Sequence, residues 1–270
     1  MSNDEMARYQ AVIFCGGQGT RIRAVADDRP KPMVEIGGRP ILWHIMKAYS
    51  ARGVRRFILA LGYRGEGIVE YFERYHSRHH DFTMRVGSPT YRQYHHPSTV
   101  DDADVESWEI TFAYTGVDTN TGGRLLRVRH YIDQDHFFCT YGDGLSDVDV
   151  RNVLETHVTS GSVGTLVGVH LPTTFGVVEA DNLGTIRSFR EKPVLPGHIN
   201  GGFFCFTPEV FDFIDGEDTA LEDAPFRRLA EQERLSMYPY DGFWHAMDHY
   251  KDYVTLNKMW TDGAAPWKVW

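Results

Sequence analysis

The sequence predicts an α/β fold in which a mixed, mostly parallel central sheet is flanked by helices. Short apolar runs alternate with segments of helical periodicity, and this alternation is typical of βαβ units. A glycine-rich loop follows the first apolar run, at the kind of strand end where open α/β sheets bind ligands. The expected strands are Gln10–Cys15, Arg56–Leu61, Glu109–Tyr114, Phe137–Thr140, Gly164–Val169 and Phe203–Phe206. The expected helices are Ile41–Arg52, Gly65–Tyr75, Gly122–His130 and Val148–Ser160.

The remaining segments are interpreted as additions to one domain that spans residues 1–270. Phe175–Ala180 and Thr185–Phe189 flank a turn-rich tetrad, so we expect a small antiparallel hairpin there. Residues from about 77 to 107 are polar and lack periodicity, which favours an excursion or lid over core structure. From about 250 to 270 we expect a helix followed by an aromatic tail that packs on the domain or on a neighbouring subunit, which makes a homo-oligomer plausible.

Composition excludes several classes of protein. The net charge of −9 argues against a nucleic-acid partner. No stretch approaches the roughly 18 apolar residues of a membrane span, and the polar N-terminal residues do not resemble a signal peptide. The three cysteines lie in apolar runs without the spacing of zinc ligands, so we expect reduced core thiols, no membrane partner and a cytoplasmic protein.

The glycine-rich loop is the first candidate site. Gly16, Gly17 and Gly19 fall within four positions, and glycine lets consecutive N–H groups approach a phosphate chain. Arg21 and Lys31 add two cations at the same end of the strand. The loop lacks both G-x-G-x-x-G and G-K-[ST], so a tight strand-to-helix turn remains the less favoured alternative.

Two carboxylates are candidate metal ligands. Asp143 follows an apolar strand between two glycines, and Asp248 lies in the late segment Trp244–His249. Carboxylates at a strand end can hold a divalent cation, Mg²⁺ or Mn²⁺, that also binds phosphate oxygens. A simple turn aspartate remains the alternative interpretation.

Three further segments carry polar groups suited to a nucleotide or a sugar. Lys192 could contact a phosphate while Glu191 binds sugar hydroxyls, although the two could equally form a surface ion pair. Thr121, with the two residues Gly122 and Arg124, could face a nucleobase, or the threonine could cap a helix. His249 is more plausibly a surface or helix-cap residue than a proton-transfer group. The third segment contains Asn200 and Gly201 and lies just before the expected strand Phe203–Phe206.

Taken in order, these motifs resemble a known family. Seven motifs follow one another in a fixed order over nearly the whole chain. They are G-G-x-G-T-R, P-K-P-M, T-G-G-R-L, Y-G-D-G, E-K-P, N-G-G-F-F and a late M-D. The set is similar to the sugar-1-phosphate nucleotidyltransferases, and within them most of all to the glucose-1-phosphate cytidylyltransferases. Pro40–Met46 and the ending Ala265–Lys268 match that subgroup almost word for word.

The resemblance implies a Rossmann-like nucleotide-diphospho-sugar transferase fold and a reaction of a nucleoside triphosphate (CTP or another) with a sugar 1-phosphate. It assigns the triphosphate to the loop of Gly16, Gly17, Gly19 and Thr20, with catalytic roles for Arg21, Lys31, Lys192 and Asp143. Asp143 and Asp248 would hold the metal. The base would face Thr121, Gly122 and Arg124, and the sugar would contact Glu191, Asn200, Gly201 and His249.

Two other functions stay open at this stage. Ala24–Ala26 replace an acidic pair and a threonine expected after the arginine, so the site could instead accept a finished nucleotide sugar and exchange its pyranose and furanose rings. A non-catalytic nucleotide-sugar-binding protein is the third possibility, which the cations and carboxylates disfavour.

Overall fold

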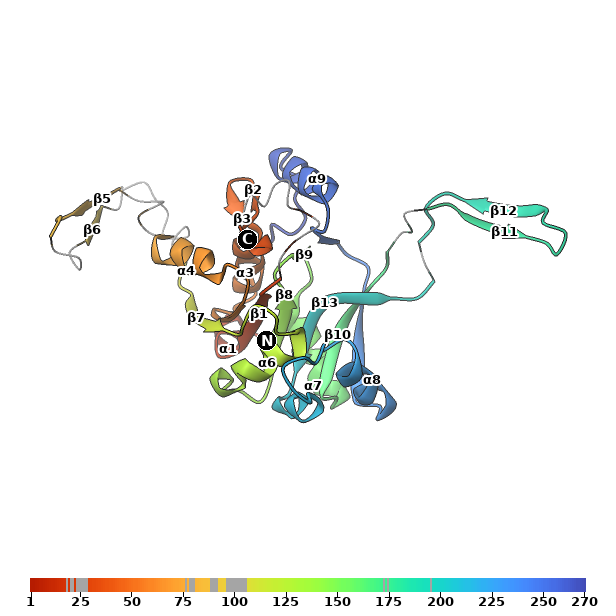
Figure 1. Cartoon of the computed structure of the whole chain (residues 1–270), viewed down its shortest axis with the longest axis horizontal. Helices are drawn as coiled ribbons and strands as arrows, with labels where there is room; N and C mark the ends of the chain where they lie inside the picture. The colour runs from red at the N-terminus through yellow and green to blue at the C-terminus, as the bar shows by residue number, and fades with distance from the viewer. Residues whose placement is uncertain are drawn as a thin grey trace.

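The protein is built around one seven-stranded sheet with the strand order β14-β10-β13-β8-β1-β4-β7 (Figure 1). A computed structural model describes residues 1–17, 19, 22, 29–75, 77, 81–87, 92–95, 106–171, 173, 175–194 and 196–270. The strands are β1 (Gln10–Cys15), β4 (Arg56–Leu61), β7 (Glu109–Tyr114), β8 (Phe137–Tyr141), β10 (Gly164–Val169), β13 (Ile199–Phe206) and β14 (Leu235–Tyr240).

All neighbouring strands of this sheet are parallel except at β13, which is antiparallel to both β8 and β10. The mixed, mostly parallel sheet is therefore confirmed. The edge strand β14 was not predicted, because Pro239 interrupts its β pattern. At an edge this proline is tolerated, since one side of the strand makes no ladder hydrogen bonds.

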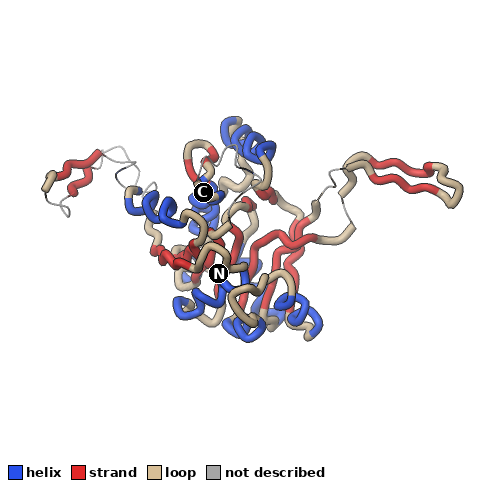
Figure 2. The backbone as a smooth tube through the Cα atoms, viewed as in Figure 1, coloured by secondary structure: helices blue, strands red, loops and turns tan. Residues whose placement is uncertain are grey.

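Helices cover both faces of the sheet (Figure 2). Residues of β1 alternate between two hydrophobic clusters, with Ile13 and Cys15 in one and Val12 and Phe14 in the other. The first cluster packs against α3 and α7, and the second against α6 and α8. These helices are α3 (Ile41–Ala51), α6 (Thr121–Val128), α7 (Val150–Ser160) and α8 (Ala224–Glu231).

The predicted helices form with small changes at their ends. The helix expected to continue to His130 stops at Val128, and residues Arg129–Tyr131 form a 3₁₀ turn (η4) instead. Helix α4 (Gly65–Glu73) ends two residues before the predicted Tyr75. Helix α8 was missed, because a run of only eight residues gives a weak periodic signal.

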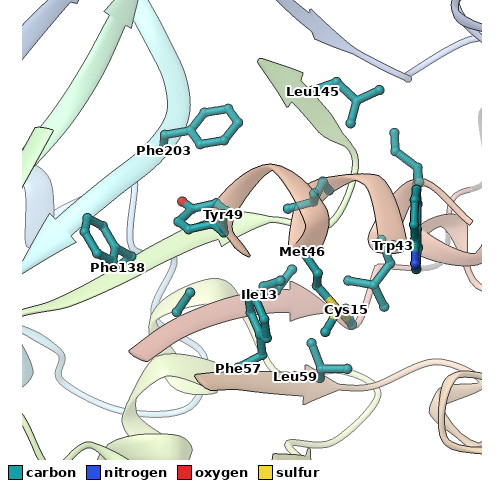
Figure 3. Packing of buried hydrophobic residues seen from close by; sticks show 14 of the residues in the cluster. Ile13, Cys15, Trp43, Met46, Tyr49, Phe57, Leu59, Phe138, Leu145 and Phe203 are labelled. Atoms are coloured by element: carbon teal, nitrogen blue, oxygen red, sulfur yellow. The ribbon is translucent and has the colours of Figure 1, made fainter. Parts of the chain in front are cut away.

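Helix α3 packs on the middle of the sheet. In Figure 3, Met46 and Tyr49 of α3 lie over the strands that carry Ile13 and Phe138, while Trp43 lies farther along the helix. Tyr49 is 2% exposed, and its ring lies edge-on to Phe138 with centroids 5.9 Å apart. This dense layer fixes β1 and β8, whose carboxyl ends carry the candidate site.

Short elements complete the chain. They are α1 (Asn3–Met6), the 3₁₀ turns η2 (Lys31–Met33) and η5 (Pro208–Phe213), and helix α9 (Tyr250–Thr261). Small antiparallel pairs are β2–β3 (Glu35–Ile36, Arg39–Pro40), β5–β6 (Asp81–Met84, Arg92–His95), β9–β15 (Gly144–Ser146, Trp244–Ala246) and β11–β12 (Val177–Ala180, Ile186–Arg190). In the described residues, no helix is long and apolar enough to cross a membrane.

Two hairpins extend from the body of the molecule (Figure 1). The predicted hairpin forms as β11–β12 and stands well away from the main sheet. Within the polar excursion, the described residues form the hairpin β5–β6, which the sequence analysis had not predicted. Its role as a lid stays a prediction.

The aromatic tail packs on its own chain. His44 of α3 lies among Trp260, Trp267 and Trp270, with ring centroids 4.7, 6.2 and 6.2 Å away. Trp267 is fully buried, and the Nε2 atom of His44 lies 2.8 Å from the carbonyl oxygen of Ile36. The predicted helix and tail are thus present, and these tryptophans anchor the chain end to the domain.

We predict that buried histidines make the fold acid-sensitive. Burial lowers the pKa of His157 in α7 to about 4, and that of His44 to about 4 as well. An unfolded histidine has a pKa of about 6.5, so unfolding takes up protons below that pH and stability falls as the pH drops toward 4. The loss amounts to roughly 1.4 kcal/mol per pH unit for each histidine.

The measurement is the free energy of unfolding from urea titrations between pH 7 and pH 4.5. The variant His157→Gln keeps a polar group beside Thr165, whose Oγ1 lies 2.8 Å from His157 Nδ1, but cannot titrate. Its stability should fall less steeply with acid than that of the wild type. His130→Gln, at an exposed position, is the control. Parallel curves for wild type and His157→Gln would contradict the prediction.

Candidate functional site

The candidate site lies where β1, β4 and β8 end. Gly16 and Gly17 follow β1, Gly62 follows β4, and Gly142 and Asp143 follow β8. These strands are parallel neighbours, so their carboxyl ends open at the same edge of the sheet. The strand pairing therefore brings the glycine-rich loop and Asp143, the first candidate metal ligand, to the same place.

Arg124 of α6 ties these strand ends to one another. Its guanidinium donates hydrogen bonds to five acceptors, which are the carbonyl oxygens of Gly16, Leu61, Gly116 and Val117 and the hydroxyl of Thr115. The side chain is buried, and burial lowers the pKa of Arg124 from its ordinary value. The predicted contact between Arg124 and a nucleobase stays a prediction, while the structure gives this residue a structural role.

The arginine also explains two glycines. A Cβ atom on Gly16 would lie 2.0 Å from Cζ of Arg124, and one on Gly62 would lie 2.5 Å from its Nη1. Gly16 is thus required by packing against the guanidinium, and not only by the approach of a ligand. A Cβ on Gly17 would meet no atom within 4 Å, so that glycine faces open space.

Lys31 bridges the two candidate metal ligands. Its Nζ lies 2.6 Å from Oδ2 of Asp143 and 2.7 Å from Oδ1 of Asp248. The lysine side chain is 13% exposed, whereas Asp143 is 28% and Asp248 41% exposed. A cation at this point thus contacts both carboxylates while they remain accessible from outside.

The pairing of β9 with β15 explains why residues so far apart in sequence meet. Gly144 pairs with Ala246, and the N–H of Met247 donates to the carbonyl oxygen of Asp143 at 2.9 Å. At the start of α9, the N–H of Asp248 donates to Oδ2 of Asp252 at 3.0 Å. Both carboxylates therefore stand on backbone that is held by hydrogen bonds.

The electrostatics of Lys31 follow from this arrangement. Partial burial alone would lower the pKa of Lys31, but the carboxylates of Asp143 and Asp248 outweigh that effect and raise the pKa above its ordinary value. The ammonium therefore stays charged at neutral pH. An ammonium at this point can stabilise negative charge on a ligand bound beside it.

Two cavities meet at this ion triad. The first, about 400 Å³, is lined by Gly16, Gly17, Lys31, Thr121, Arg124, Tyr141 and Asp143, among others. The second, about 340 Å³, is lined by residues that include Tyr141, Asp143, Asn200, Gly201, Trp244 and Asp248. Four of the seven predicted nucleotide contacts (Gly16, Gly17, Thr121 and Arg124) thus line one cavity, and two predicted sugar contacts line the other. Tyr141 and Asp143 line both.

Glu222, which the sequence analysis did not single out, organises the first cavity. Its Oε2 accepts a hydrogen bond from Thr121 Oγ1 at 2.6 Å, and its Oε1 accepts one from the hydroxyl of Tyr141. Burial and the carboxylate of Glu222 raise the pKa of Tyr141, so the tyrosine remains a donor. Glu222 lies outside any motif, and no signal in the sequence points to it.

Thr121 is not the helix cap that the sequence left open as an alternative. Asn120 is the N-cap of α6, and Thr121 is its first helical residue. The threonine hydroxyl instead accepts a hydrogen bond from the N–H of Leu221 at 2.9 Å. Gly122, behind it, has no room for a side chain, since a Cβ would lie 2.7 Å from the carbonyl oxygen of Thr219.

The wall of the second cavity is formed by the start of β13. The amide oxygen of Asn200 accepts a hydrogen bond from the N–H of Gly202 at 2.8 Å, and Trp244 Nε1 donates to the carbonyl oxygen of Gly201 at 2.7 Å. Gly202 has a φ of +75°, and a Cβ there would lie 2.3 Å from the ring of Tyr141. Only glycine fits this position, so the N-G-G motif serves the shape of the cavity.

Three predicted sugar or phosphate ligands lie outside the two cavities. Lys192 and Glu191 follow β12, are largely exposed, and form an ion pair at 3.5 Å. This is the surface pair that the sequence left open as the alternative. His249 is 68% exposed and is the N-cap of α9, where its N–H donates to Asp252. The structure thus gives it the helix-cap role, and the contacts of all three with substrate stay predictions.

Two predicted ligands, Thr20 and Arg21, lie outside the described residues. Gly19 is described, with a φ of +59°, and a Cβ there would lie 3.0 Å from Cβ of Lys31. The loop therefore passes close to the stem of the lysine that bridges the carboxylates.

The protein offers a magnesium or manganese ion two of its ligands. Asp143 and Asp248 offer two carboxylates, and the described residues contain no cluster of three or more His, Cys, Asp or Glu that could hold a metal. Mg²⁺ is commonly bound by one or two carboxylates, with water and substrate phosphate oxygens as the other ligands. The residues fit an ion that binds together with a phosphate-bearing substrate.

Comparison with known proteins shows where the chain belongs. Residues 10–262 match the sequence model of a family described as nucleotidyl transferase. The chain is 44% identical to a probable glucose-1-phosphate cytidylyltransferase of Bacillus subtilis (strain 168), over 97% of this chain and 100% of that protein. It is 43% identical to a glucose-1-phosphate cytidylyltransferase of Salmonella typhimurium, over 97% of this chain and 99% of that protein.

A solved structure, HddC from Yersinia pseudotuberculosis, shares the fold with a TM-score of 0.66 at 22% identity, covering 93% of this chain and 99% of that chain. The relatives named here lend no support to a ring-exchanging mutase or to a non-catalytic binding protein. The predicted membership of the sugar-1-phosphate nucleotidyltransferases is confirmed. The chain belongs to the nucleotidyl transferase family and is a sugar-1-phosphate nucleotidyltransferase.

Proposed function

We propose that the chain transfers a cytidylyl group from CTP to glucose 1-phosphate, in a reaction that requires Mg²⁺ or Mn²⁺. The identities of 44% and 43% to glucose-1-phosphate cytidylyltransferases support the choice of base and sugar. The observation that carries the proposal is the ion triad of Lys31, Asp143 and Asp248 at the junction of two cavities. Two substrates that occupy these cavities would meet at that junction.

The chemistry needs no general base from the protein. An oxygen of the sugar phosphate is already anionic and attacks the α-phosphorus of the nucleotide, while the bond to the β-phosphate breaks and its electron pair leaves with pyrophosphate. Catalysis then consists of positioning and of charge stabilisation. Lys31 is the described cation at the junction, and we assign it to the charge on the α-phosphate.

Asp143 and Asp248 would hold the divalent ion, which would supply positive charge against the phosphate oxygens. In the first cavity, Gly17 leaves its backbone open to the phosphates, and Thr121 with Tyr141 forms the wall that we assign to the base. In the second, Asn200 and the backbone of Gly201 would face the sugar.

A contact of Lys192 with the sugar phosphate remains part of the proposal on the family resemblance alone. Lys192 precedes β13 by seven residues, and Asn200 of β13 lines the sugar cavity. For the contact to form, the segment between Lys192 and β13 must bend toward that cavity. Arg21, assigned to the departing pyrophosphate, is proposed on the same ground.

The substrate assignment is tested with purified protein, Mg²⁺ or Mn²⁺, and a panel of CTP, UTP, GTP, ATP and dTTP with glucose 1-phosphate or mannose 1-phosphate. We expect the fastest release of pyrophosphate from CTP with glucose 1-phosphate. A second triphosphate with a tenfold higher kcat/KM would overturn the cytidine assignment. CDP-glucose alone should not be rearranged, and a change in its sugar ring would revive the mutase reading.

The metal site is tested with Asp143→Asn, which removes one charge from the triad. We expect kcat/KM to fall by about a hundredfold or more, because the divalent ion that would stabilise charge at the reacting phosphate is held less tightly. The half-saturating concentration of Mg²⁺ should rise as well. Asp262→Asn is the matched control, because Asp262 forms a surface ion pair with Lys258 on α9. Equal activity and equal metal dependence in Asp143→Asn and the wild type would remove Asp143 from the site.

The wall of the nucleotide cavity is tested with Glu222→Ala, which deprives Thr121 and Tyr141 of their common acceptor. Loss of these hydrogen bonds should raise KM for CTP about tenfold and leave kcat nearly unchanged. Glu222→Gln, which retains one acceptor and one donor, should restore much of the affinity.

The neighbouring variant Asp223→Ala is the control for this experiment, because Asp223 is exposed and pairs only locally with Arg227. A fall in kcat without a change in KM, or an equal effect of both alanine variants, would argue against a positioning role for Glu222.

A further inference from the structure

Selection of one base over another requires a polar group that faces the base and has hydrogen-bonding capacity left. Bases are distinguished by the donors and acceptors on their edges, and a protein reads them with groups of the opposite kind. In the proposed reaction, that group must lie in the first cavity, beyond the position of the phosphates.

The base end of the first cavity lies at the end of β7. The strand order β8-β1-β4-β7 places the carboxyl ends of β8 and β7 three strand spacings apart, which is roughly 14 Å. Lys31 and Asp143 stand at the β8 end, and residues 117–121 follow β7. All of them line the same cavity. A nucleotide whose phosphates lie at Lys31 therefore extends toward the segment 117–121 with its base.

This segment is held by hydrogen bonds at both ends. At one end, Arg124 donates to the carbonyl oxygen of Gly116 at 2.7 Å and to that of Val117 at 3.0 Å. At the other end, the N–H and the side-chain amide of Asn120 donate to two carbonyl oxygens of the loop before α8, at 3.1 and 2.7 Å. The backbone on either side of Asp118 is therefore fixed.

Most polar side chains on this part of the wall already have partners. Thr121 donates to Glu222 and accepts from a backbone N–H, and the hydroxyl of Tyr141 also donates to Glu222. Arg124 donates to five acceptors. Asp118 differs from these residues, because its exposed side chain lines the cavity but forms no hydrogen bond or ion pair with the described part of the chain.

The chemistry of this group determines what it can recognise. An ionised carboxylate only accepts hydrogen bonds, so Asp118 favours a ligand that presents a donor. The neighbouring residues agree with this preference. The amide oxygen of Asn120 is an acceptor as well, and the hydroxyl of Thr119 can accept as readily as it donates.

We propose that Asp118 selects cytosine by accepting a hydrogen bond from its 4-amino group, an inference that rests on the proposed use of CTP. Cytosine carries this donor at the position where uracil and thymine carry a carbonyl oxygen. A carboxylate that faces this position attracts the amino group and repels the carbonyl oxygen, so it favours one base and disfavours the others. Aspartate and glutamate read the same amino group of cytosine in nucleic acids.

The general electrostatic effect of Asp118 can be separated from base selection. Its negative charge repels the phosphates of every nucleoside triphosphate to the same extent, whatever the base. Only a contact with the edge of the base changes the ratio between two nucleotides. The preference for one nucleotide over another is therefore the quantity to measure.

The first test compares CTP with the 5′-triphosphate of pyrimidin-2-one riboside, which lacks only the 4-amino group. Wild-type kcat/KM should be at least about tenfold higher for CTP, because the analogue makes no hydrogen bond to the charged acceptor. In Asp118→Ala the two values should agree within about twofold. Because Asp118 is exposed and bonds to no described residue, this variant should fold normally. The same preference in wild type and Asp118→Ala would overturn the proposal.

The second test uses Asp118→Asn, whose amide can donate to the carbonyl oxygen of uracil. The ratio of kcat/KM for CTP to that for UTP should fall about tenfold or more, through KM and with little change in kcat. Asp218→Asn is the matched control, because it removes the same charge from an exposed side chain outside the cavity. An equal fall in both variants would show that charge alone acts, and would contradict base selection by Asp118.

Product binding supplies a measurement that needs no turnover. By calorimetry, the wild type should bind CDP-glucose at least about tenfold more tightly than UDP-glucose, and Asp118→Ala should lose most of this difference. A wild type that prefers a triphosphate other than CTP would overturn the proposed function and this inference with it. A wild type that prefers CTP, together with an unchanged preference in Asp118→Ala, would overturn the role of Asp118 alone.

Discussion

The site depends on one cation that holds two distant carboxylates together. Lys31 contacts Asp143 and Asp248, which are 105 residues apart in sequence, at 2.6 and 2.7 Å. Two carboxylates so close would repel each other, and the ammonium between them removes that penalty. Because β9 pairs with β15, the backbone beneath this triad is fixed as well. The two cavities therefore share a charged centre that stands on fixed backbone.

A second cation shapes the nucleotide side of the site without facing solvent. Arg124 binds four carbonyl oxygens and one hydroxyl from the ends of β1, β4 and β7, and its guanidinium occupies the space that side chains on Gly16 or Gly62 would need. A buried arginine is stabilising only when its donors are satisfied, and here every bond is made to a chain segment that lines or supports the cavity. The glycines and the arginine therefore form one structural unit.

Two exposed aromatic side chains and two that pack on the domain show how the chain distributes its apolar surface. Trp260 and Trp267 close over His44 and fasten α9 to the domain, so the tail needs no neighbour to cover it. Phe175 and Phe189, in and beside the hairpin β11–β12, are in contrast 79% and 63% exposed. The sequence left open whether the tail packs on its own domain or on a neighbouring subunit, and the ring contacts with His44 place it on its own domain.

Apolar periodicity is a local signal, so the α/β class and five of the seven sheet strands, to within one residue, could be predicted from the sequence. It could not reveal β14, since Pro239 obscures the pattern and only the edge position makes it tolerable. Nor could it reveal Glu222, or the packing need for Gly16, because both depend on residues distant in the chain. Tertiary structure alone decided that Lys31 bridges the carboxylates and that Lys192 stays outside the cavities. Such contacts follow from strand pairing across the sheet, which no local pattern encodes.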